Sequence, residues 1–345
     1  MGIQENERLY IDLKKKICNL IYQGIYQEDA KIPPERVLAE EFEVSRITVR
    51  KALELLEEEH LIIREVGRGT RVNFVNKGTS GNMDMVALVA PARGVFFSKF
   101  IEYFQKCMAQ HDSLLLYVEK PERETIENCL YRLYQKEIRN VVVWLDDVQV
   151  EQERLKRLRA LGMNMVFFDT DAALPYADCV YLNNENAMRS LTEVMHKNGK
   201  STLEYIGWDK QEIYSVLARR QAFLRLEKKG ICHEVPWKRQ NELSEQMNSL
   251  LKKYQEKGNL ADAIICGSGE IGIEAAKTLR RLGIRGVKVA SVDEFENSAK
   301  HRITTYGQDF VEIANVIYEC LRQQNENGDI WKAECYPITG ILIER

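Results

Sequence analysis

The chain has 345 residues, a formal net charge of −3, 45% hydrophobic residues and 29% charged residues, which is ordinary for a globular protein. This length suggests two or three domains, each large enough for a core of its own. No apolar run approaches the roughly 20 residues of a membrane span and the N-terminus has no signal-peptide core, so we expect a cytoplasmic protein.

The eight cysteines are scattered, without a C-x-x-C pair and without a histidine at ligand spacing. This distribution predicts reduced thiols rather than a disulfide framework or a zinc site. We therefore expect no metal and no cofactor. The eight are Cys18, Cys107, Cys129, Cys179, Cys232, Cys266, Cys320 and Cys335.

The first predicted element is an amphipathic helix over residues 7–23, which should pack behind the helices that follow it. Lys14, Lys15 and Lys16 lie outside its apolar stripe. The stripe itself is expected to contain Leu9, Leu13, Ile17, Leu20 and Ile21.

Residues 33–72 predict two helices joined by a three-residue turn and followed by a short hairpin. Pro33-Pro34 presets the backbone for the first helix, and Ser45 is a good N-cap for the second. The buried side of the first helix is expected to be Val37, Leu38 and Phe42. In the second helix, apolar residues at i, i+3, i+4 and i+7 form a stripe that should face the core. They are Val49, Ala52, Leu53 and Leu56.

The second helix carries cations at its start and acids at its end. Duplex DNA would attract the first end and repel the other, so this helix could enter a major groove only N-terminus first. Residues 1–75 hold 12 Lys/Arg and 14 Asp/Glu, so the prediction depends on where the charges lie. Around the first turns, four side chains are predicted to be free of the core: Arg46, Thr48, Arg50 and Lys51. The acids at the end of the helix are Glu54, Glu57, Glu58 and Glu59.

The hairpin from 61–63 to 70–72 is expected to turn at Gly67-Arg68-Gly69. The two glycines permit positive φ and leave a lone arginine at the tip, which suits a minor groove or a phosphate. A helix, a turn, a second helix and such a hairpin predict a winged helix-turn-helix.

These motifs resemble the DNA-binding domain of GntR-family regulators. The matching stretches are Leu9-Tyr10…Leu13, the Pro33–Arg36 box, Val44-Ser45-Arg46-x-Thr48-Val49-Arg50-x-Ala52-Leu53, Leu61-Ile62 and Gly67-Arg68-Gly69-Thr70. The resemblance implies that residues 1–75 bind double-stranded operator DNA. It assigns the contacts to Arg36, Ser45, Arg46, Thr48, Arg50, Lys51, Gly67, Arg68 and Gly69.

Three residues depart from the family pattern. Asp29 and His60 stand where the family usually has glycine, and Arg71 replaces an aromatic residue in the wing. His60 is the costlier departure, because a non-glycine residue in a left-handed helix cap is strained. Arg71 could add a phosphate contact.

Residues 76–84 are polar and rich in Gly, Ser and Asn, which predicts a flexible linker and a domain boundary. Beyond it, apolar strands alternate with amphipathic helices, as in parallel βαβ units. The α/β stretch 85–345 is long enough that two similar lobes are more natural than one sheet. Strands are predicted at Met85–Ala90, Ser113–Val118, Asn140–Leu145, Met163–Asp169, Cys179–Leu182, Thr202–Gly207, Ala261–Cys266 and Val287–Val292, with a final strand through Ile341–Arg345. Helices are predicted at Phe97–Ala109, Ile126–Gln135, Leu155–Leu161, Ala187–Met195, Arg219–Lys228, Ser244–Tyr254, Ile271–Leu282 and Phe310–Gln323.

One stretch admits a different hypothesis. Gly267-x-Gly269-x-x-Gly272 follows a strand and opens a helix, as in a dinucleotide-binding fingerprint, and would make the chain a nicotinamide-binding sensor or enzyme. Asp293 lies later than the motif requires, the motif lies deep in the second lobe, and no catalytic group accompanies it. An enzyme fusion using pyridoxal phosphate is also open, but no convincing Schiff-base lysine is present.

Residues 85–345 also resemble the LacI/GalR-type sensor domain, a relative of periplasmic sugar-binding proteins. The matching stretches run through the domain in order: Val86–Pro91, Phe96-Phe97, Phe168-Asp169, Val180-x-x-Asn183-Asn184, Asn198-Gly199-Lys200, Ile206-Gly207, Arg219-x-x-Ala222-Phe223, Asp262-Ala263-Ile264, Gly283, Val289–Asp293, Thr304-Thr305-x-x-Gln308-Asp309-Phe310 and Ile341–Arg345. A GntR-type head on this sensor is the layout of arabinose-repressor-like regulators.

The resemblance implies a ligand cleft between two lobes, where carboxylates and an arginine bind sugar hydroxyls and an aromatic face covers the ring. Ser268-Gly269 replaces the usual Asn-Asp, which leaves two alternatives for the ligand: an unusual sugar, or a molecule that is not a sugar. The residues implied are Phe97, Asp169, Trp208, Arg219, Ser268, Asp293 and Phe310.

Taken together, these resemblances imply a ligand-controlled transcription factor, most simply a repressor, and not an enzyme. The sensor is expected to form a homodimer and to place two heads on successive half-sites. Because the linker is expected to be flexible, a ligand would act by allowing or forbidding simultaneous engagement of both heads.

Overall fold

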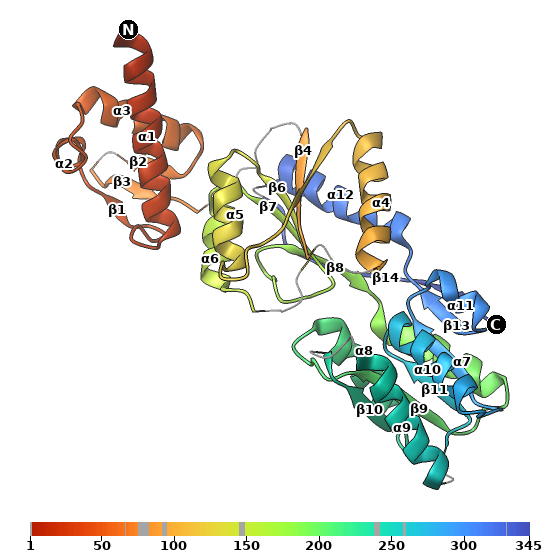
Figure 1. Ribbon diagram of the computed structural model, residues 1–345. Helices are drawn as coiled ribbons and strands as arrows, with labels where there is room; N and C mark the ends of the chain where they lie inside the picture. The colour runs from red at the N-terminus through yellow and green to blue at the C-terminus, as the bar shows by residue number, and fades with distance from the viewer. Residues whose placement is uncertain are drawn as a thin grey trace.

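A computed structural model describes residues 2–65, 67–74, 83–91, 95–144, 149–237, 242–257, 260–328 and 330–345. It has a small N-terminal head and two α/β lobes that follow one another along the molecule (Figure 1). Most of the expected linker, residues 75–82, lies outside the described part of the chain. Among the described helices, none is long and apolar enough to cross a membrane.

The head is a winged helix-turn-helix, as predicted. Ser45 caps the second helix of the motif, where its side chain accepts a hydrogen bond from the Thr48 backbone N at 3.1 Å. A two-residue strand that the sequence did not predict, β1, pairs antiparallel with the wing. The elements are α1 (Gly2–Tyr22), β1 (Lys31–Ile32), α2 (Glu35–Glu41), α3 (Arg46–Glu58), β2 (Ile62–Glu65) and β3 (Gly69–Val72).

The core of the head follows the predicted stripes with four exceptions. Leu9 and Val37, expected to face inward, are 43% and 38% exposed, and Leu20 and Phe42 are only partly buried. Leu9 belongs to the first turns of α1, which extend beyond the other helices (Figure 1). The residues that do form the core include Leu13, Ile17, Ile21, Leu38, Val49, Ala52, Leu53 and Leu56.

Two of the departures from the family pattern lie in the left-handed region of backbone space. The φ angles are 60° for Asp29 and 59° for His60. The sequence prediction of a strained cap at His60 is therefore confirmed in the backbone.

We expect the substitution His60→Gly to stabilise the chain by about 1 kcal/mol, because a left-handed conformation costs a non-glycine residue roughly that much. The His60 side chain is exposed and its carbonyl, which accepts a bond from Asn73 Nδ2, would be retained. Denaturant unfolding of the two proteins would measure the difference. His60→Ala, which keeps the Cβ, should bring no such gain, and an equal gain in both would show that the backbone strain is not the cause.

The first lobe is a six-stranded parallel sheet in the order β14-β8-β7-β6-β4-β5. Its strands are β4 (Met85–Val89), β5 (Leu114–Val118), β6 (Asn140–Trp144), β7 (Asn164–Phe168), β8 (Asp178–Leu182) and β14 (Cys335–Ile338). Helices α4 (Val95–Gln110), α5 (Ile126–Gln135), α6 (Gln152–Ala160) and α12 (Phe310–Glu326) cover it. Every strand and helix predicted for this lobe is present, and β14 was not predicted.

The second lobe has the order β10-β9-β11-β12-β13-β15, parallel except for β15. Its strands are β9 (Leu203–Trp208), β10 (Ile231–Val235), β11 (Ala263–Cys266), β12 (Lys288–Val292), β13 (Thr304–Gly307) and β15 (Ile341–Ile343). Its helices are α7 (Asn184–Lys197), α8 (Tyr214–Leu226), α9 (Leu243–Lys257), α10 (Gly269–Arg281) and α11 (Glu296–Lys300). Here β10, β13 and α11 were not predicted as elements.

The chain crosses between the lobes after β8, after β13 and after β14. Tyr306, at the second crossing, accepts hydrogen bonds on its hydroxyl from Asn186 Nδ2 and from the Gly340 backbone N, both at 2.9 Å. One side chain thus connects all three crossings, which places the hinge beside the carboxyl ends of both sheets, where α/β proteins bind ligands.

Candidate DNA-binding surface and ligand cleft

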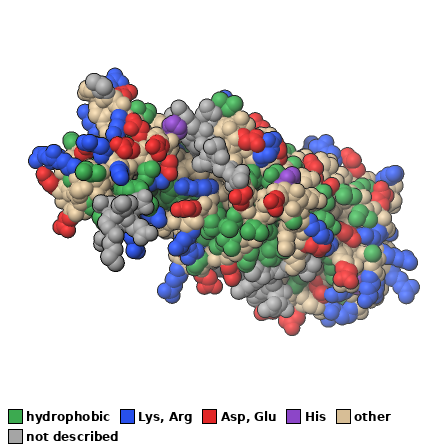
Figure 2. Space-filling view, turned by 90° about the horizontal axis from the view of Figure 1, so that it is seen from above, with side chains coloured by type: hydrophobic (Ala, Val, Ile, Leu, Met, Phe, Trp, Pro, Cys, Tyr) green, Lys and Arg blue, Asp and Glu red, His purple; other side chains and the backbone are tan. Residues whose placement is uncertain are grey.

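The N-terminal end of α3 presents an exposed surface, the reading face, formed by Arg46, Ile47 and Arg50. The acidic residues that follow lie at the far end of the same helix, so the charge order predicted from the sequence holds in space. Basic and acidic side chains are interspersed over the rest of the head (Figure 2). The reading face is therefore a local feature and not part of a broad basic surface.

Three candidate arginines make exposed ion pairs within the head. Arg50 binds Glu35 through Nε at 3.3 Å and Nη2 at 3.1 Å. Arg36 Nη1 lies 3.3 Å from Glu40, and Arg68 Nη1 lies 3.4 Å from Glu65. Exposed pairs of this kind contribute about 1 kcal/mol or less, so these guanidinium groups can exchange a carboxylate for a phosphate or a base edge at little cost.

Two of the predicted contact residues are engaged elsewhere. Thr48 is buried and its hydroxyl lies 2.8 Å from Ser45 Oγ, so the prediction that Thr48 is free is wrong. The Lys51 ammonium lies over the Tyr10 ring of α1, 5.4 Å from its centroid. Ile47, which is 69% exposed, was not among the predicted residues. The signal was an apolar residue outside the core stripe, and such a side chain suits a thymine methyl group.

The wing has the predicted glycine geometry. Gly67 and Gly69 have φ angles of 81° and 83°, and nothing lies within 4 Å of a Cβ built on either. The backbone is therefore open to close approach, and Arg68 projects between them with 72% of its side chain exposed. Arg71 is only partly exposed and its guanidinium donates to the Asp29 carbonyl at 3.5 Å, which leaves it less available for the suggested phosphate contact.

Between the lobes, the structure brings three of the predicted ligand residues together around Arg219. Its guanidinium lies 3.6 Å from Asp293, and Nη1 donates to the Gly267 carbonyl at 2.7 Å. Asp169 and Asp293 end strands of different lobes, and both take left-handed backbone angles, 61° and 71°. The result is a buried arginine between two carboxylates at the hinge.

Sequence reasoning missed three polar partners of this cluster, which are Asn184, Ser215 and Gln308. Asn184 Oδ1 accepts from Arg219 Nε at 2.8 Å, Ser215 Oγ donates to Asp169 at 2.8 Å, and Gln308 Nε2 donates to Asp293 at 2.9 Å. The second polar atom of two of them, Asn184 Nδ2 and Gln308 Oε1, is buried without a hydrogen-bond partner. A buried donor and a buried acceptor beside the cluster are suited to a ligand hydroxyl.

The ionisation of Asp169 depends on its burial. Desolvation raises the pKa of Asp169 to about 6, against the lowering effects of Arg219 and of the Ser215 hydroxyl. Between the ordinary value of 3.8 and about 6, the folded chain thus binds more protons at this site than the unfolded chain does. Stability contributed by this group is therefore lost as pH rises through that window.

We expect Asp169→Asn to raise the unfolding midpoint relative to the unchanged chain, and to do so more at about pH 7.5 than at about pH 4.5. The amide has no charge to desolvate, while Ser215 Oγ keeps an oxygen acceptor. Thermal unfolding of both proteins at the two pH values would measure this. A difference that is independent of pH would contradict the raised pKa.

A groove of about 270 Å³ opens beside Asp293 and is lined from both lobes. Phe310, at the start of α12, lines it and stacks on Tyr103 with 5.9 Å between ring centroids. Lys99 of the first lobe donates to the Glu294 carbonyl of the second at 2.8 Å. Phe310 thus places an aromatic ring next to the polar cluster, and its contact with a ligand stays a prediction.

The other three predicted ligand residues do not join this cluster. Phe97 is 9% exposed and packs against Tyr117 and Trp144 in the core of the first lobe. Trp208 is buried edge-on against Trp237 in the second lobe. Ser268 caps α10, where its hydroxyl accepts from the Ile271 backbone N at 3.5 Å. These side chains have structural roles here.

The glycines of the dinucleotide-like loop are accounted for by packing inside the second lobe. A Cβ on Gly267 would lie 2.2 Å from the Tyr205 hydroxyl, one on Gly269 would lie 2.3 Å from the Phe295 ring, and one on Gly272 would lie 2.7 Å from Ser291. Because the chain's own side chains fill these positions, the loop needs no pyrophosphate to explain its sequence.

The head and the body resemble different groups of known proteins. Residues 9–72 match the family model of bacterial regulatory proteins, gntR family. Over 64 residues the chain is 50% identical to the uncharacterized HTH-type transcriptional regulator YurK of Bacillus subtilis. This alignment covers 19% of this chain and 26% of that protein. The chain thus aligns with about a quarter of the length of that relative.

A second relative matches along nearly the whole chain. The arabinose metabolism transcriptional repressor of Halalkalibacterium halodurans is 20% identical over 346 residues, which is 93% of this chain and 91% of that protein. Both relatives carry the names of transcriptional regulators.

Solved structures resemble the body. The trehalose repressor from Escherichia coli superposes with a TM-score of 0.62 at 14% identity, covering 76% of this chain and all of that one. The lac repressor dimer bound to operator gives a TM-score of 0.61 at 14% identity, covering 75% and 93%. At this level of identity the likeness establishes the fold of the two lobes.

Proposed function

We propose that this chain, which joins a GntR-type DNA-binding head to a body with the LacI-type sensor fold, is a transcriptional repressor controlled by a neutral sugar. The observation that carries the proposal is the pairing of two separate sites in one chain. One is the arginine-led reading face with its wing, and the other is the Arg219 cluster at the hinge between two lobes. A role on chromosomal DNA places the protein in the cytoplasm.

The DNA site is assigned to the reading face, the wing arginine and the first turns of α2 and α3. Arg46, Ile47 and Arg50 would meet base edges, while Arg36 and Arg68 would meet phosphates or the minor groove. In support, all five side chains are exposed. The acidic end of α3 would remain outside the groove, since phosphates repel it.

The effector is assigned by the chemistry of the cleft. Asp169 and Glu270 both interact electrostatically with Asp293, and the pKa of Glu270 is raised by burial and by Asp293. Phosphorylated or carboxylated sugars would be repelled by these acids. A neutral polyol can donate to the carboxylates and to Gln308 Oε1 and accept from Arg219 and Asn184 Nδ2, while its C–H face covers Phe310.

The oligomer is proposed to be a dimer built on the first lobe. Hydrophobic side chains gather over the middle of one face of the molecule (Figure 2). The edge strand β5 exposes Leu114 and Leu116, and β4 beside it exposes Met85, at 67%, 37% and 39%. Exposed apolar edge strands favour association. A two-fold dimer would place two heads on half-sites of a palindromic operator.

Two measurements test the proposal. Selection from a random duplex library should enrich a sequence with two-fold symmetry, and enrichment should disappear for the Arg46→Ala/Arg50→Ala pair. Thermal unfolding against neutral sugars, sugar phosphates and NADH should show stabilisation by a neutral sugar alone. Stabilisation by NADH would favour the dinucleotide hypothesis instead, and no enriched DNA would remove the DNA-binding role.

A further inference from the structure

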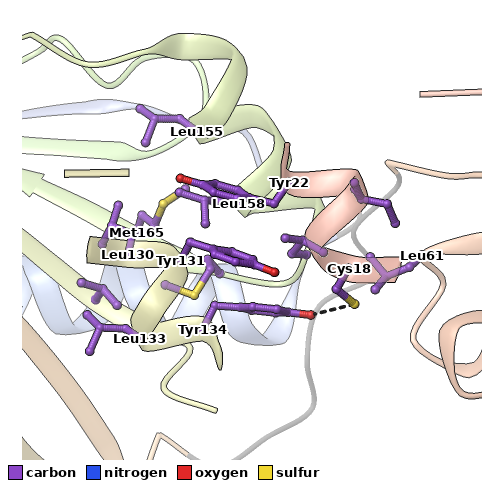
Figure 3. Close-up of a cluster of buried hydrophobic side chains, with 14 of the residues drawn as sticks. Cys18, Tyr22, Leu61, Leu130, Tyr131, Leu133, Tyr134, Leu155, Leu158 and Met165 are labelled. Atoms are coloured by element: carbon purple, nitrogen blue, oxygen red, sulfur yellow. Dashed lines mark hydrogen bonds between the residues drawn. The ribbon is translucent and has the colours of Figure 1, made fainter. Parts of the chain in front are cut away.

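The head is not joined to the body by the linker alone, because the end of α1 packs directly on the first lobe. The Tyr22 ring lies flat on the ring of Tyr131 in α5, with 3.9 Å between centroids and 1° between planes (Figure 3). The Tyr22 hydroxyl also donates to Asn128 Oδ1 at 2.8 Å. The linker is therefore not the sole connection between the head and the body.

One turn earlier in α1, Cys18 makes the second contact of this seam. The Tyr134 hydroxyl donates to Cys18 Sγ at 3.4 Å (Figure 3), and Cys18 is 2% exposed. Burial raises the pKa of the Cys18 thiol, which keeps it neutral beside the ring. Arg139 covers the other side of Tyr134 at 4.0 Å from the ring centroid. The buried residues here form one continuous cluster from the head into the first lobe.

Helix α6 completes the seam from a second direction. Arg157 Nη1 donates to the Tyr22 carbonyl at 3.4 Å, and Lys156 pairs with Glu28 of the head at 2.7 Å. Gly24 has a φ of 76°, and a Cβ there would lie 2.8 Å from the Arg157 guanidinium. The absence of a side chain at Gly24 thus leaves room for the Arg157 guanidinium beside the turn that follows α1.

The opposite side of α6 is tied to the helix that starts at the ligand cleft. Arg159 is buried and donates to Gln324 Oε1 at 3.2 Å and to the Gln324 carbonyl at 3.4 Å, near the end of α12. The residue Gln308, two positions before α12 begins, donates to Asp293 in the cleft. Helix α12 therefore links the ligand cleft to α6.

We propose that the head and the first lobe move as one rigid body, held by the seam of Cys18, Tyr22, Tyr131, Tyr134 and Arg157. A rotation of the first lobe then turns the reading face with it, since that face lies on the exposed side of the docked head. The use of this coupling in regulation rests on the proposed function. The seam itself can be tested with neither DNA nor an effector.

The test is the reactivity of Cys18 in the intact chain under native conditions. A polyethylene glycol maleimide is suitable, because a cavity of about 250 Å³ borders Cys18 and a small reagent could enter it. Modification is followed by mass spectrometry of the peptides. Cys179 and Cys320, buried within the first lobe, report any unfolding of that lobe.

In the unchanged chain, Cys18 should be protected as well as Cys179 and Cys320 are. The lobe-side pair Tyr131→Ser/Tyr134→Ser should expose it, with modification at least tenfold faster and the two internal cysteines unchanged. Tyr318→Ser, on α12 and away from the seam, should leave all three protected. Rapid modification of Cys18 in the unchanged chain, or continued protection in the tyrosine pair, would overturn the proposal.

If all three thiols become reactive in the double tyrosine variant, a surface variant distinguishes loss of the seam from unfolding of the lobe. Lys156→Glu/Arg157→Glu places acids opposite Glu28 and leaves the aromatic core intact. Cys18 alone should then become reactive, and its protection in this variant would overturn the proposal.

Discussion

Replacing Arg219 with alanine is expected to abolish binding of the proposed neutral sugar. It should also lower the free energy of unfolding by about 3–5 kcal/mol, the usual loss when one partner of a buried ion pair is removed. The substitution leaves Asp293 buried beside Asp169 without their shared cation, and it removes the donor to the Gly267 carbonyl. Denaturant unfolding and the thermal shift with the sugar would measure the two effects.

The neighbouring residue provides the control. Arg220 pairs with Glu234 at 3.3 Å near the surface of the second lobe, so Arg220→Ala should cost about 1 kcal/mol or less and leave sugar binding intact. Equal losses of stability and of sugar binding in the two variants would show that these effects do not depend on the position of Arg219 in the cleft.

The second large effect concerns the reading face. Arg50→Ala should weaken operator binding by about 1–3 kcal/mol if Arg50 reads a base edge, and sugar binding should not change. Fluorescence anisotropy of a labelled operator duplex would measure the affinity at a fixed salt concentration.

Glu35→Gln is the matched control for this variant. It removes the charge that holds Arg50 at 3.1 Å without touching the arginine. Because the pair must open when Arg50 contacts DNA, Glu35→Gln should bind at least as tightly as the unchanged chain. Unaltered binding by Arg50→Ala, or weakened binding by Glu35→Gln alone, would contradict the assignment.

Local sequence signals predicted the elements of the head well. The helix starts, the Ser45 cap and the Gly67–Gly69 turn depend on neighbouring residues, and all three are present. The apolar central strands of both lobes were also predicted, because their apolar runs need no information about distant partners. The buried strand β13 was missed, because Thr304–Gly307 is not an apolar run. The short edge strands β10 and β14 were missed, since half-exposed strands lack such runs.

The cleft could be predicted only in part. Asp169, Arg219 and Asp293 follow from strand ends and from the family pattern, and the structure brings them together. Phe97 and Trp208 were predicted to line the cleft but lie in the cores of the lobes. The sequence does not distinguish the two places, because an aromatic residue next to a strand end can face either the cleft or the core. Only packing against Trp144 and Trp237 decides between the two.

The seam between the head and the first lobe was beyond sequence reasoning. Tyr22 and Tyr131 are 109 positions apart by their residue numbers, and each lies on an amphipathic helix that looks complete by itself. Nothing local distinguishes a tyrosine that faces another domain from one that faces solvent. The polar partners Asn184 and Ser215 were missed for the same reason, since they meet Arg219 and Asp169 only in the folded chain.

The most direct test of ligand control is the operator affinity of the intact chain with and without the proposed neutral sugar effector. Coupling of about 1–3 kcal/mol between the cleft and the head predicts a roughly 5- to 150-fold change in operator affinity when the sugar is bound. An operator affinity that stays the same at a sugar concentration that saturates the cleft would contradict the account.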